Sequence, residues 1–156
     1  MGGDLSSAPF SIALRVYYQD TDAGGVTFHA AYLEFFERSR IEWLREHGFD
    51  SRTMTGDFRC LFIVRKLQIE YRRPARLDDL LQVTTEIQRL GRAQLTFFQQ
   101  VIRGRELLVE AAVNLACVDI ADLRPMPIPE AIRERCAADV NAQPRTKSID
   151  VRGYLS

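Results

Sequence analysis

The stretch YYQDTDAGGVTFHAAYLEFFERSRIEWLREHG, residues 17–48, decides how the rest of the chain must fold. From about His29 or Ala30 its apolar residues recur at helical spacing, and the pattern ends at Gly48, a residue favoured just after a helix. The apolar arc covers roughly half of the circumference, which is wider than the stripe of an ordinary surface helix. We therefore expect other elements to pack around much of this helix, against Tyr32, Leu33, Phe35, Phe36, Trp43 and Leu44.

The rest of the chain predicts mainly β-strands joined by tight turns, and turns of this length connect antiparallel strands. Pro74 ends the second strand, and the later turns are LGR at 90–92 and RGRE at 103–106. An antiparallel sheet of about five strands that curls around one long helix, an α+β arrangement, satisfies this pattern. A doubly wound α/β sheet would need helices between the later strands, and the sequence predicts none there. The expected strands are residues 10–19, 67–73, 80–88, 93–102 and 107–119.

The length of 156 residues is that of a single domain. Pro129 is a favourable first-turn residue, so we expect a short helix at Glu130 to Cys136. Residues 1–10 and 139–156 are expected to form flexible tails.

Composition excludes several classes of protein. Apolar residues make up 46% and charged residues 27%, which is typical of a soluble globular protein. Lys plus Arg and Asp plus Glu both number 21, so the zero net charge argues against a general attraction to nucleic acid. No apolar stretch is long enough to span a membrane, and no secretory signal pattern is present. We therefore expect a cytoplasmic protein.

The potential metal ligands are scattered. The three cysteines, Cys60, Cys117 and Cys136, are far apart and predict neither a disulfide framework nor a zinc site, but free thiols in a reducing compartment. The two histidines, His29 and His47, lie at opposite ends of one predicted helix. We expect no metal site.

The first half of the opening stretch contains the residue types of a catalytic site. Gly24 and Gly25 would let another molecule approach the main chain closely. The first N–H groups of the helix, near His29, have no intrahelical partner and can stabilise a carbonyl oxygen that becomes negatively charged. A carboxylate such as Asp20 or Asp22 can attack an acyl carbon or take a proton from water. Together these groups are sufficient for a reactive acyl group such as a thioester.

The same residues also have a purely structural interpretation. Asp and Gly are common in turns, and Asp is a common cap near the start of a helix. A single histidine is more often a structural residue than a catalyst, and His47 is at a helix end where the dipole favours it. From the residues alone, the turn-and-cap interpretation is the more frequent one.

Residues 17–48 resemble the signature of the 4-hydroxybenzoyl-CoA thioesterase family of the hotdog fold, and more narrowly the Tol-Pal-associated acyl-CoA thioesterases of Gram-negative bacteria. The resemblance is strongest in the pattern D-x-D-x-G-G-V-x-x-H-x-x-Y, from Asp20 to Tyr32. It continues in LQIEYRRPARLDDLLQV, residues 67–83, and in AAVNLACVDIADLRPMPIP, residues 111–129. It spans roughly residues 14–132, most of the chain.

The resemblance implies a role for each residue of this pattern. Asp22 lies where the family has its catalytic carboxylate. The backbone N–H of His29 would face the thioester carbonyl, with the imidazole as a second contact to substrate or water. Gly24 and Gly25 would line the approach of the thioester, and Tyr32 would contact the substrate region or pack the helix. The remaining matches, with less defined roles in packing or orientation, are Asp20 and Glu37.

The resemblance also implies partners. It implies an acyl-CoA substrate with no separate cofactor, and homodimers joined at their sheet edges, often paired into homotetramers, with active sites between subunits. Acyl carrier protein is a further expected partner. Two positions depart from the family pattern: Gln19 replaces a frequent acid, and Ala31 replaces a frequent asparagine, which affects substrate preference more than catalysis. The basic residues expected to bind the CoA phosphates are Arg65, Lys66, Arg89 and Arg92.

Hydrolysis of an acyl-CoA thioester is therefore the leading hypothesis, and two alternatives stay open. A hotdog hydratase or dehydratase needs a base for an α-proton, commonly a histidine with an acid partner. The acid here precedes the histidine in the thioesterase order, which disfavours that reaction. A non-catalytic partner that binds acyl-CoA or acyl carrier protein would use the same pocket.

Overall fold

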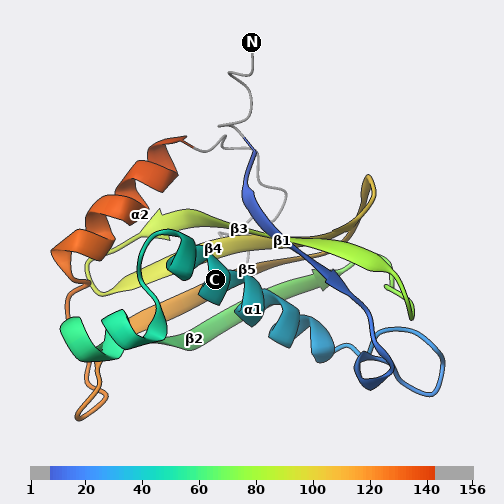
Figure 1. Ribbon diagram of the computed structural model, residues 1–156, viewed down its shortest axis with the longest axis horizontal. Coiled ribbons are helices and arrows are strands. Elements are labelled where there is room, and N and C mark those ends of the chain that lie inside the picture. Colours follow the sequence, from blue (N-terminus) through green and yellow to red (C-terminus); the bar gives the residue numbers. More distant parts are fainter. Residues whose placement is uncertain (1–7, 143–156) are drawn as a thin grey trace.

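The computed structural model describes residues 8–142, in which a long helix lies across one face of a five-stranded antiparallel sheet (Figure 1). The strand order is β1-β3-β4-β5-β2, so β1 and β2 are the edge strands. The expected α+β arrangement is confirmed. The elements are β1 (Phe10–Arg15), a 3-10 turn (Tyr18–Asp20), α1 (Ala31–Glu46), a π-helical turn (Thr53–Asp57), β2 (Cys60–Tyr71), β3 (Leu80–Leu90), β4 (Gln94–Arg103), β5 (Glu106–Asp119) and α2 (Glu130–Ala142).

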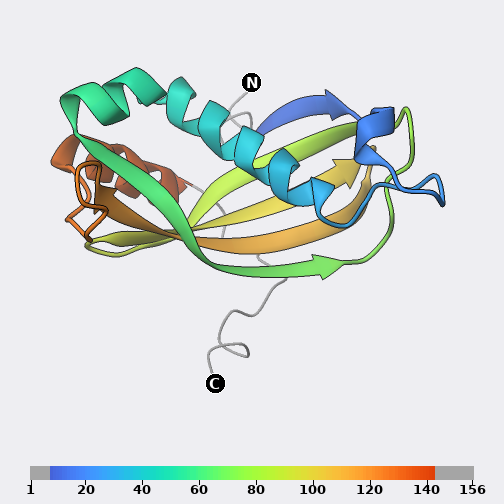
Figure 2. The same ribbon diagram turned by 90° about the horizontal axis from the view of Figure 1, so that it is seen from below.

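Helix α1 buries its aromatic side against the sheet (Figure 2). Phe35, Phe36 and Trp43 are almost fully buried, and the Trp43 ring meets Phe97 of β4 edge to face at a centroid distance of 5.2 Å. Leu33, on the flank of the predicted apolar arc, is 39% exposed. The chain itself therefore covers the arc only partly, and the exposed part faces the edge strand β2.

Helix α2 covers the sheet beyond the C-terminal end of α1 and packs on β3. It begins at Glu130 as expected but continues to Ala142 instead of ending at Cys136. Val140, assigned to a tail by the sequence, packs against the hydrophobic core, which explains the longer helix. The other predicted tail already contributes Phe10 to β1, and its residues 1–7, like residues 143–156, lie outside the described residues.

Strand β2 begins at Cys60, earlier than the predicted start at residue 67. Its first half pairs with β5, but a bulge between Val64 and Lys66 interrupts the register. Residues 60–64 are all apolar, so the period-two pattern of apolar and polar residues is visible only after the bulge. Within residues 8–142, no helix is long and apolar enough to cross a membrane.

Candidate active site

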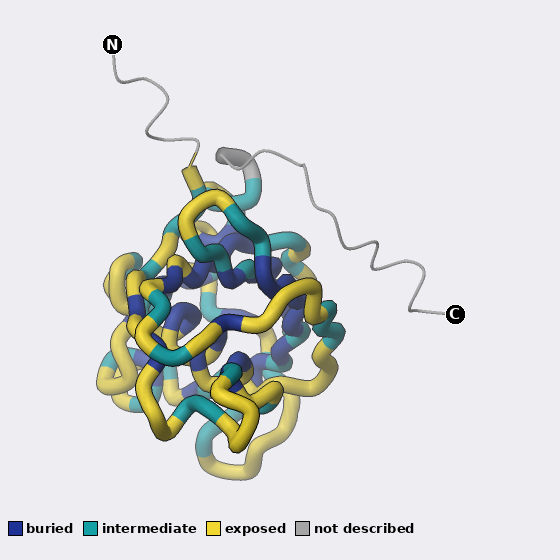
Figure 3. The backbone as a smooth tube through the Cα atoms, turned by 90° about the vertical axis from the view of Figure 1, so that its right-hand side faces the viewer, coloured by how far each residue is buried: buried dark blue, intermediate teal, exposed yellow. Residues whose placement is uncertain are grey.

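The loop between β1 and α1 is folded by its own backbone hydrogen bonds. The N–H of Asp22 donates to the carbonyl oxygen of Val26 at 3.0 Å, and the N–H of Gly25 donates to that of Asp22, also at 3.0 Å. Thr21 and Thr27 form an antiparallel bridge at its base. Figure 3, viewed from this end of the molecule, shows exposed backbone around a buried interior. The loop is thus a defined structure at the surface.

The two glycines of the loop serve different purposes. Gly25 has a φ of +78°, a conformation that side-chain-bearing residues rarely adopt. The N–H of Gly24 donates to Oδ1 of Asp22 at 2.9 Å, and a Cβ at Gly24 would lie 3.3 Å from that same oxygen. Gly24 therefore makes room for the Asp22 carboxylate, which is exposed. The turn interpretation and the catalytic interpretation of Asp22 are compatible.

A free N–H group lies two residues before the first residue of helix α1. It begins at Ala31, without a side-chain cap, and the N–H of Ala31 donates to the carbonyl oxygen of Phe28. Among the described residues, the N–H of His29 has no hydrogen-bond partner. This group is therefore available to a ligand at the positive end of the helix dipole.

The end of β2 fixes the start of α1. The hydroxyl of Tyr71 donates to the carbonyl oxygen of His29 at 2.9 Å, and the hydroxyl of Tyr32 accepts the N–H of Ala75 at the same distance. The N–H of Thr27 donates to the carbonyl oxygen of Ala75 at 2.8 Å. Two segments more than forty residues apart thereby hold the His29 main chain in place.

A cavity of about 250 Å³ opens beside His29. Burial raises the pKa of the Tyr71 hydroxyl in its wall, and the buried Oγ1 of Thr27 has no hydrogen-bond partner among the described residues. Asp22, Gly24 and Gly25 do not line it. The residues that line it are Thr27, His29, Tyr32, Tyr71, Arg72, Arg73 and Pro74.

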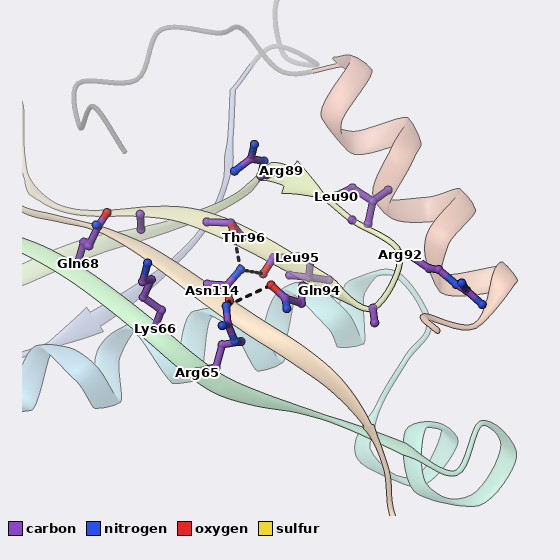
Figure 4. A pocket seen from close by; sticks show the side chains of 13 residues that line it. Arg65, Lys66, Gln68, Arg89, Leu90, Arg92, Gln94, Leu95, Thr96 and Asn114 are labelled. Atoms are coloured by element: carbon purple, nitrogen blue, oxygen red, sulfur yellow. Dashed lines mark hydrogen bonds between the residues drawn. The ribbon is translucent and has the colours of Figure 1, made fainter. Parts of the chain in front are cut away.

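The four basic residues expected to bind CoA lie together in a second cavity, of about 420 Å³ (Figure 4). Arg65 donates to Oδ1 of Asn114 at 3.1 Å and to Oε1 of Gln94 at 3.3 Å. Neighbouring residues of a strand point to opposite faces of the sheet. Val113 lies on the face that carries α1, so Asn114 and this cavity lie on the other face. None of the described residues that line this cavity is acidic. The four are Arg65, Lys66, Arg89 and Arg92.

The expected site residues therefore form two groups within one protomer. The turn between β3 and β4 is held against α2, because Arg133 donates to the carbonyl oxygens of Gly91 and Arg92. Figure 1 places α2 at the other end of the sheet from the loop that carries Asp22. The basic cavity and the cavity beside His29 are not continuous in the protomer.

Asp20 and Glu37, the remaining matches to the sequence pattern, interact with other residues of the chain and do not line the cavity beside His29. Oδ2 of Asp20 accepts the N–H of Tyr17 at 2.9 Å and so closes the 3-10 turn. Glu37 is exposed on α1 near the Arg40 guanidinium. No group of three or more potential metal ligands occurs within residues 8–142. The sequence pattern does not predict Tyr71 or Thr27 as site residues. For Tyr71 the alternation in LQIEY is a signal, because it places this residue on the same face of the strand as Leu67.

The part of the chain that contains these residues matches the model of a known family. The family model described as the thioesterase-like superfamily matches residues 16–136. The chain belongs to this superfamily. The matched residues contain the Asp22 loop, the start of α1 and all four basic residues of the second cavity. The expected family and the hotdog fold are thereby confirmed.

Curated relatives within the superfamily are similar over most of their length. The chain is 44% identical over 124 residues to the acyl-CoA thioesterase YbgC of Haemophilus influenzae, covering 80% of this chain and 91% of that protein. It is 43% identical over 129 residues to the acyl-CoA thioester hydrolase YbgC of Escherichia coli O6:H1, covering 82% and 96%. The crystal structure of a probable thioesterase from Bartonella henselae has a TM-score of 0.75 at 38% identity, over 78% of this chain and all of that one.

Proposed function

We propose that this protein hydrolyses an acyl-CoA thioester to a free acid and CoA at the loop between β1 and α1. The observation that carries the proposal is the free N–H of His29 at the start of α1, with the Asp22 carboxylate on the same short loop. The names of the relatives at 43–44% identity, acyl-CoA thioesterase and acyl-CoA thioester hydrolase, support the same chemistry.

The proposed chemistry needs one carboxylate and one hydrogen-bond donor. The His29 N–H donates to the thioester oxygen as the carbonyl carbon is attacked and the oxygen gains negative charge. In one route, Asp22 attacks the carbon, the CoA thiolate leaves, and water hydrolyses the mixed anhydride. In the other, Asp22 takes a proton from water, the resulting hydroxide attacks the carbon, and the proton passes to the departing thiolate. Both routes give the same acid and thiol.

A second copy of the chain completes the proposed site. Asp22 does not line the cavity beside His29, and the edge strand β2 presents Ile63, Val64 and Leu67 to solvent. An exposed apolar edge strand is a template for pairing with another strand. We therefore propose a homodimer in which the β2 strands pair, with further association into a homotetramer through the sheets. The partner then supplies the missing walls around the thioester.

The basic cavity is the proposed site of the CoA phosphates. Phosphate groups favour arginine and lysine partners, and four such residues line this cavity without an acidic neighbour among its described lining residues. Because this cavity is at the other end of the protomer from Asp22, the CoA held by one protomer would react at the loop of another. Acyl carrier protein presents its acyl group on the same phosphopantetheine arm and is proposed as a second acyl donor. The cytoplasm and the Tol-Pal association remain the proposed setting.

Replacing Asp22 by asparagine tests the catalytic role directly. Asparagine keeps an oxygen that can accept the Gly24 N–H, so the loop should retain its shape. We expect a fall in kcat of about 10²- to 10⁴-fold, because the carboxylate would be lost as nucleophile or base. The measurement is thiol release from a series of acyl-CoAs, with the oligomeric state followed by light scattering. Near-wild-type turnover by Asp22→Asn would refute the assignment.

Two further assays separate the routes and the alternatives. A single turnover in ¹⁸O-labelled water would place label in the Asp22 carboxylate only if Asp22 is the nucleophile. Hydration of crotonyl-CoA without thiol release would identify a hydratase instead. Binding of acyl-CoAs without any thiol release, with Asp22 intact, would identify a non-catalytic binding protein.

A further inference from the structure

An open groove runs between α1 and the edge strand β2, on the face of the sheet that carries the helix. Its volume is about 280 Å³, and most of its wall is apolar. We refer to it as the α1–β2 groove. Its lining residues are Leu33, Glu34, Phe36, Glu37 and Arg40 of α1, Val64 and Leu67 of β2, and Val113 of β5.

One wall of this groove contains a buried charge. Arg40 is only 8% exposed, and its Nη1 donates to Oε1 of Gln99 at 3.0 Å. Gln99 is itself fixed, because its Nε2 donates to the carbonyl oxygen of Phe36 and to Oγ1 of Thr85. Burial lowers the pKa of the Arg40 guanidinium to about 10, and the Glu37 carboxylate opposes this shift. Arg40 therefore stays positively charged at neutral pH and is held at a fixed place.

One end of the groove lies at the first turn of α1, as does the cavity beside His29. Tyr32 lines the cavity beside His29, and its neighbour Leu33 lines the groove. From Leu33 to Arg40 the helix advances seven residues, about 10 Å along its axis. The groove thus leads from the first turn of α1 to a buried guanidinium near the middle of the helix.

We propose that the α1–β2 groove holds the acyl chain of the substrate and that Arg40 limits its length. This inference rests on the proposed thioester hydrolysis at His29 and adds its acyl specificity. A volume of about 280 Å³ has room for on the order of nine groups the size of a water molecule, at about 30 Å³ each. The substrates it fits are straight aliphatic acyl groups of medium length. In the proposed dimer, the second copy covers the groove along Val64 and Leu67.

The physical reason for a limit is the cost of covering a charge. Each methylene buried against Leu33, Phe36 and Val113 should improve kcat/KM by about four-fold. A chain that reaches Arg40 meets a guanidinium that Gln99 holds in place, and it covers the part that is still exposed without offering an acceptor. The gain should therefore stop, and then reverse, at the length that meets Arg40.

The test compares Arg40→Met with Arg38→Met across acyl-CoAs from acetyl to palmitoyl. Methionine keeps an unbranched side chain but removes the charge, and Arg38 is an exposed arginine on the same helix outside the groove. The readout is the ratio of kcat/KM on each chain to that on acetyl-CoA, whose two-carbon acyl group is the shortest of the series. We expect a medium-chain optimum for the wild type and Arg38→Met, and an optimum at least two carbons longer for Arg40→Met.

A second variant covers the case in which Arg40→Met does not fold, since Arg40 also contacts the buried Gln99. Leu33→Trp fills the start of the groove from a partly exposed position and should reduce the medium-chain to acetyl ratio at least ten-fold. Identical ratios in the wild type and the groove variants would overturn the inference while leaving thioester hydrolysis intact. Absence of thiol release from every acyl-CoA by the wild type would instead overturn the proposed function.

Discussion

At the scale of single residues, the Asp22 loop offers two glycines with separable effects. A Cβ at Gly24 would crowd Oδ1 of Asp22 at 3.3 Å, whereas a Cβ at Gly25 would meet nothing within 4 Å but would force a side chain into a φ of +78°. One substitution therefore disturbs the proposed catalytic group, and the other strains the backbone. The two consequences can be measured independently.

We expect Gly24→Ala to lower kcat by on the order of ten-fold or more with little change in Tm, because a small displacement of a reacting group is costly. Gly25→Ala should instead destabilise the fold by about 1–2 kcal/mol, the usual cost of a left-handed residue with a Cβ. Gly25→Asn is the matched control, since asparagine tolerates this conformation better. Steady-state kinetics and thermal unfolding of the three variants check this. Equal losses of Tm for Gly24→Ala and Gly25→Ala would contradict the separation.

The sequence identifies the residues of this loop better than their surroundings. Asp22, His29 and the glycines are close in the chain, so a pattern of local spacing contains them. Tyr71 and Ala75, which hold the start of α1, come from more than forty residues away, and no local pattern specifies their contacts. Long-range contacts of this kind depend on strand register, which the bulge in β2 shifts by one residue.

At the scale of elements, the turn between β3 and β4 joins the basic cavity to α2. The main chain at Arg92 is fixed there, since its carbonyl oxygen accepts both the side chain of Arg133 and the N–H of Ile128. The cavity is thus framed by sheet and helix backbone before any ligand binds. A preformed site of this kind should affect binding of phosphates without taking part in the reaction.

We expect the double variant Arg89→Ala, Arg92→Ala to raise KM for acyl-CoA by about ten-fold with kcat nearly unchanged. The effect is modest because an exposed pair of an arginine and a phosphate contributes little to the free energy of binding. The same variant should hydrolyse the N-acetylcysteamine thioester, which has no phosphates, as the wild type does. Arg52→Ala, at an exposed arginine outside the cavity, is the control for loss of charge. An equal KM effect on both substrates would exclude phosphate binding by these residues.

The contact between α2 and α1 predicts a pH dependence of stability. Burial raises the pKa of the Asp139 carboxyl. Nε2 of His47 lies 3.8 Å from Oδ1 of Asp139, and its charge lowers this pKa by a smaller amount. A carboxyl whose pKa is raised by folding stabilises the fold below its ordinary pKa, and this contribution is lost as pH rises through the raised value. Asp139→Asn should therefore be more stable than the wild type at pH 7, and the difference should disappear below about pH 3.9. Urea unfolding of both proteins between pH 3 and 7 measures this difference in stability. A wild type that is more stable than Asp139→Asn at pH 7 would contradict the prediction.

At the scale of the whole molecule, the α+β architecture follows from the sequence because one helix has more apolar surface than a surface helix needs. The burial of Phe35, Phe36 and Trp43 against a sheet is the result. What the sequence could not assign is the part of the arc that the protomer leaves open, around Leu33 and the edge of β2. In the proposed dimer a second chain covers that region, and no intrachain pattern determines where that chain lies.

Because the edge of β2 is open, we expect Leu67→Lys to convert the proposed dimer into a monomer with little activity. Leu67 is 36% exposed on the edge strand, and a lysine at such a place opposes strand pairing. Ile41→Lys is the matched control, because Ile41 is 45% exposed on α1 and does not line the α1–β2 groove. Light scattering and thiol release should show a monomeric, nearly inactive Leu67→Lys beside an oligomeric, active Ile41→Lys. An active dimer of Leu67→Lys would mean that the partner lies elsewhere, and that Asp22 and His29 meet the substrate without help from a paired β2 strand.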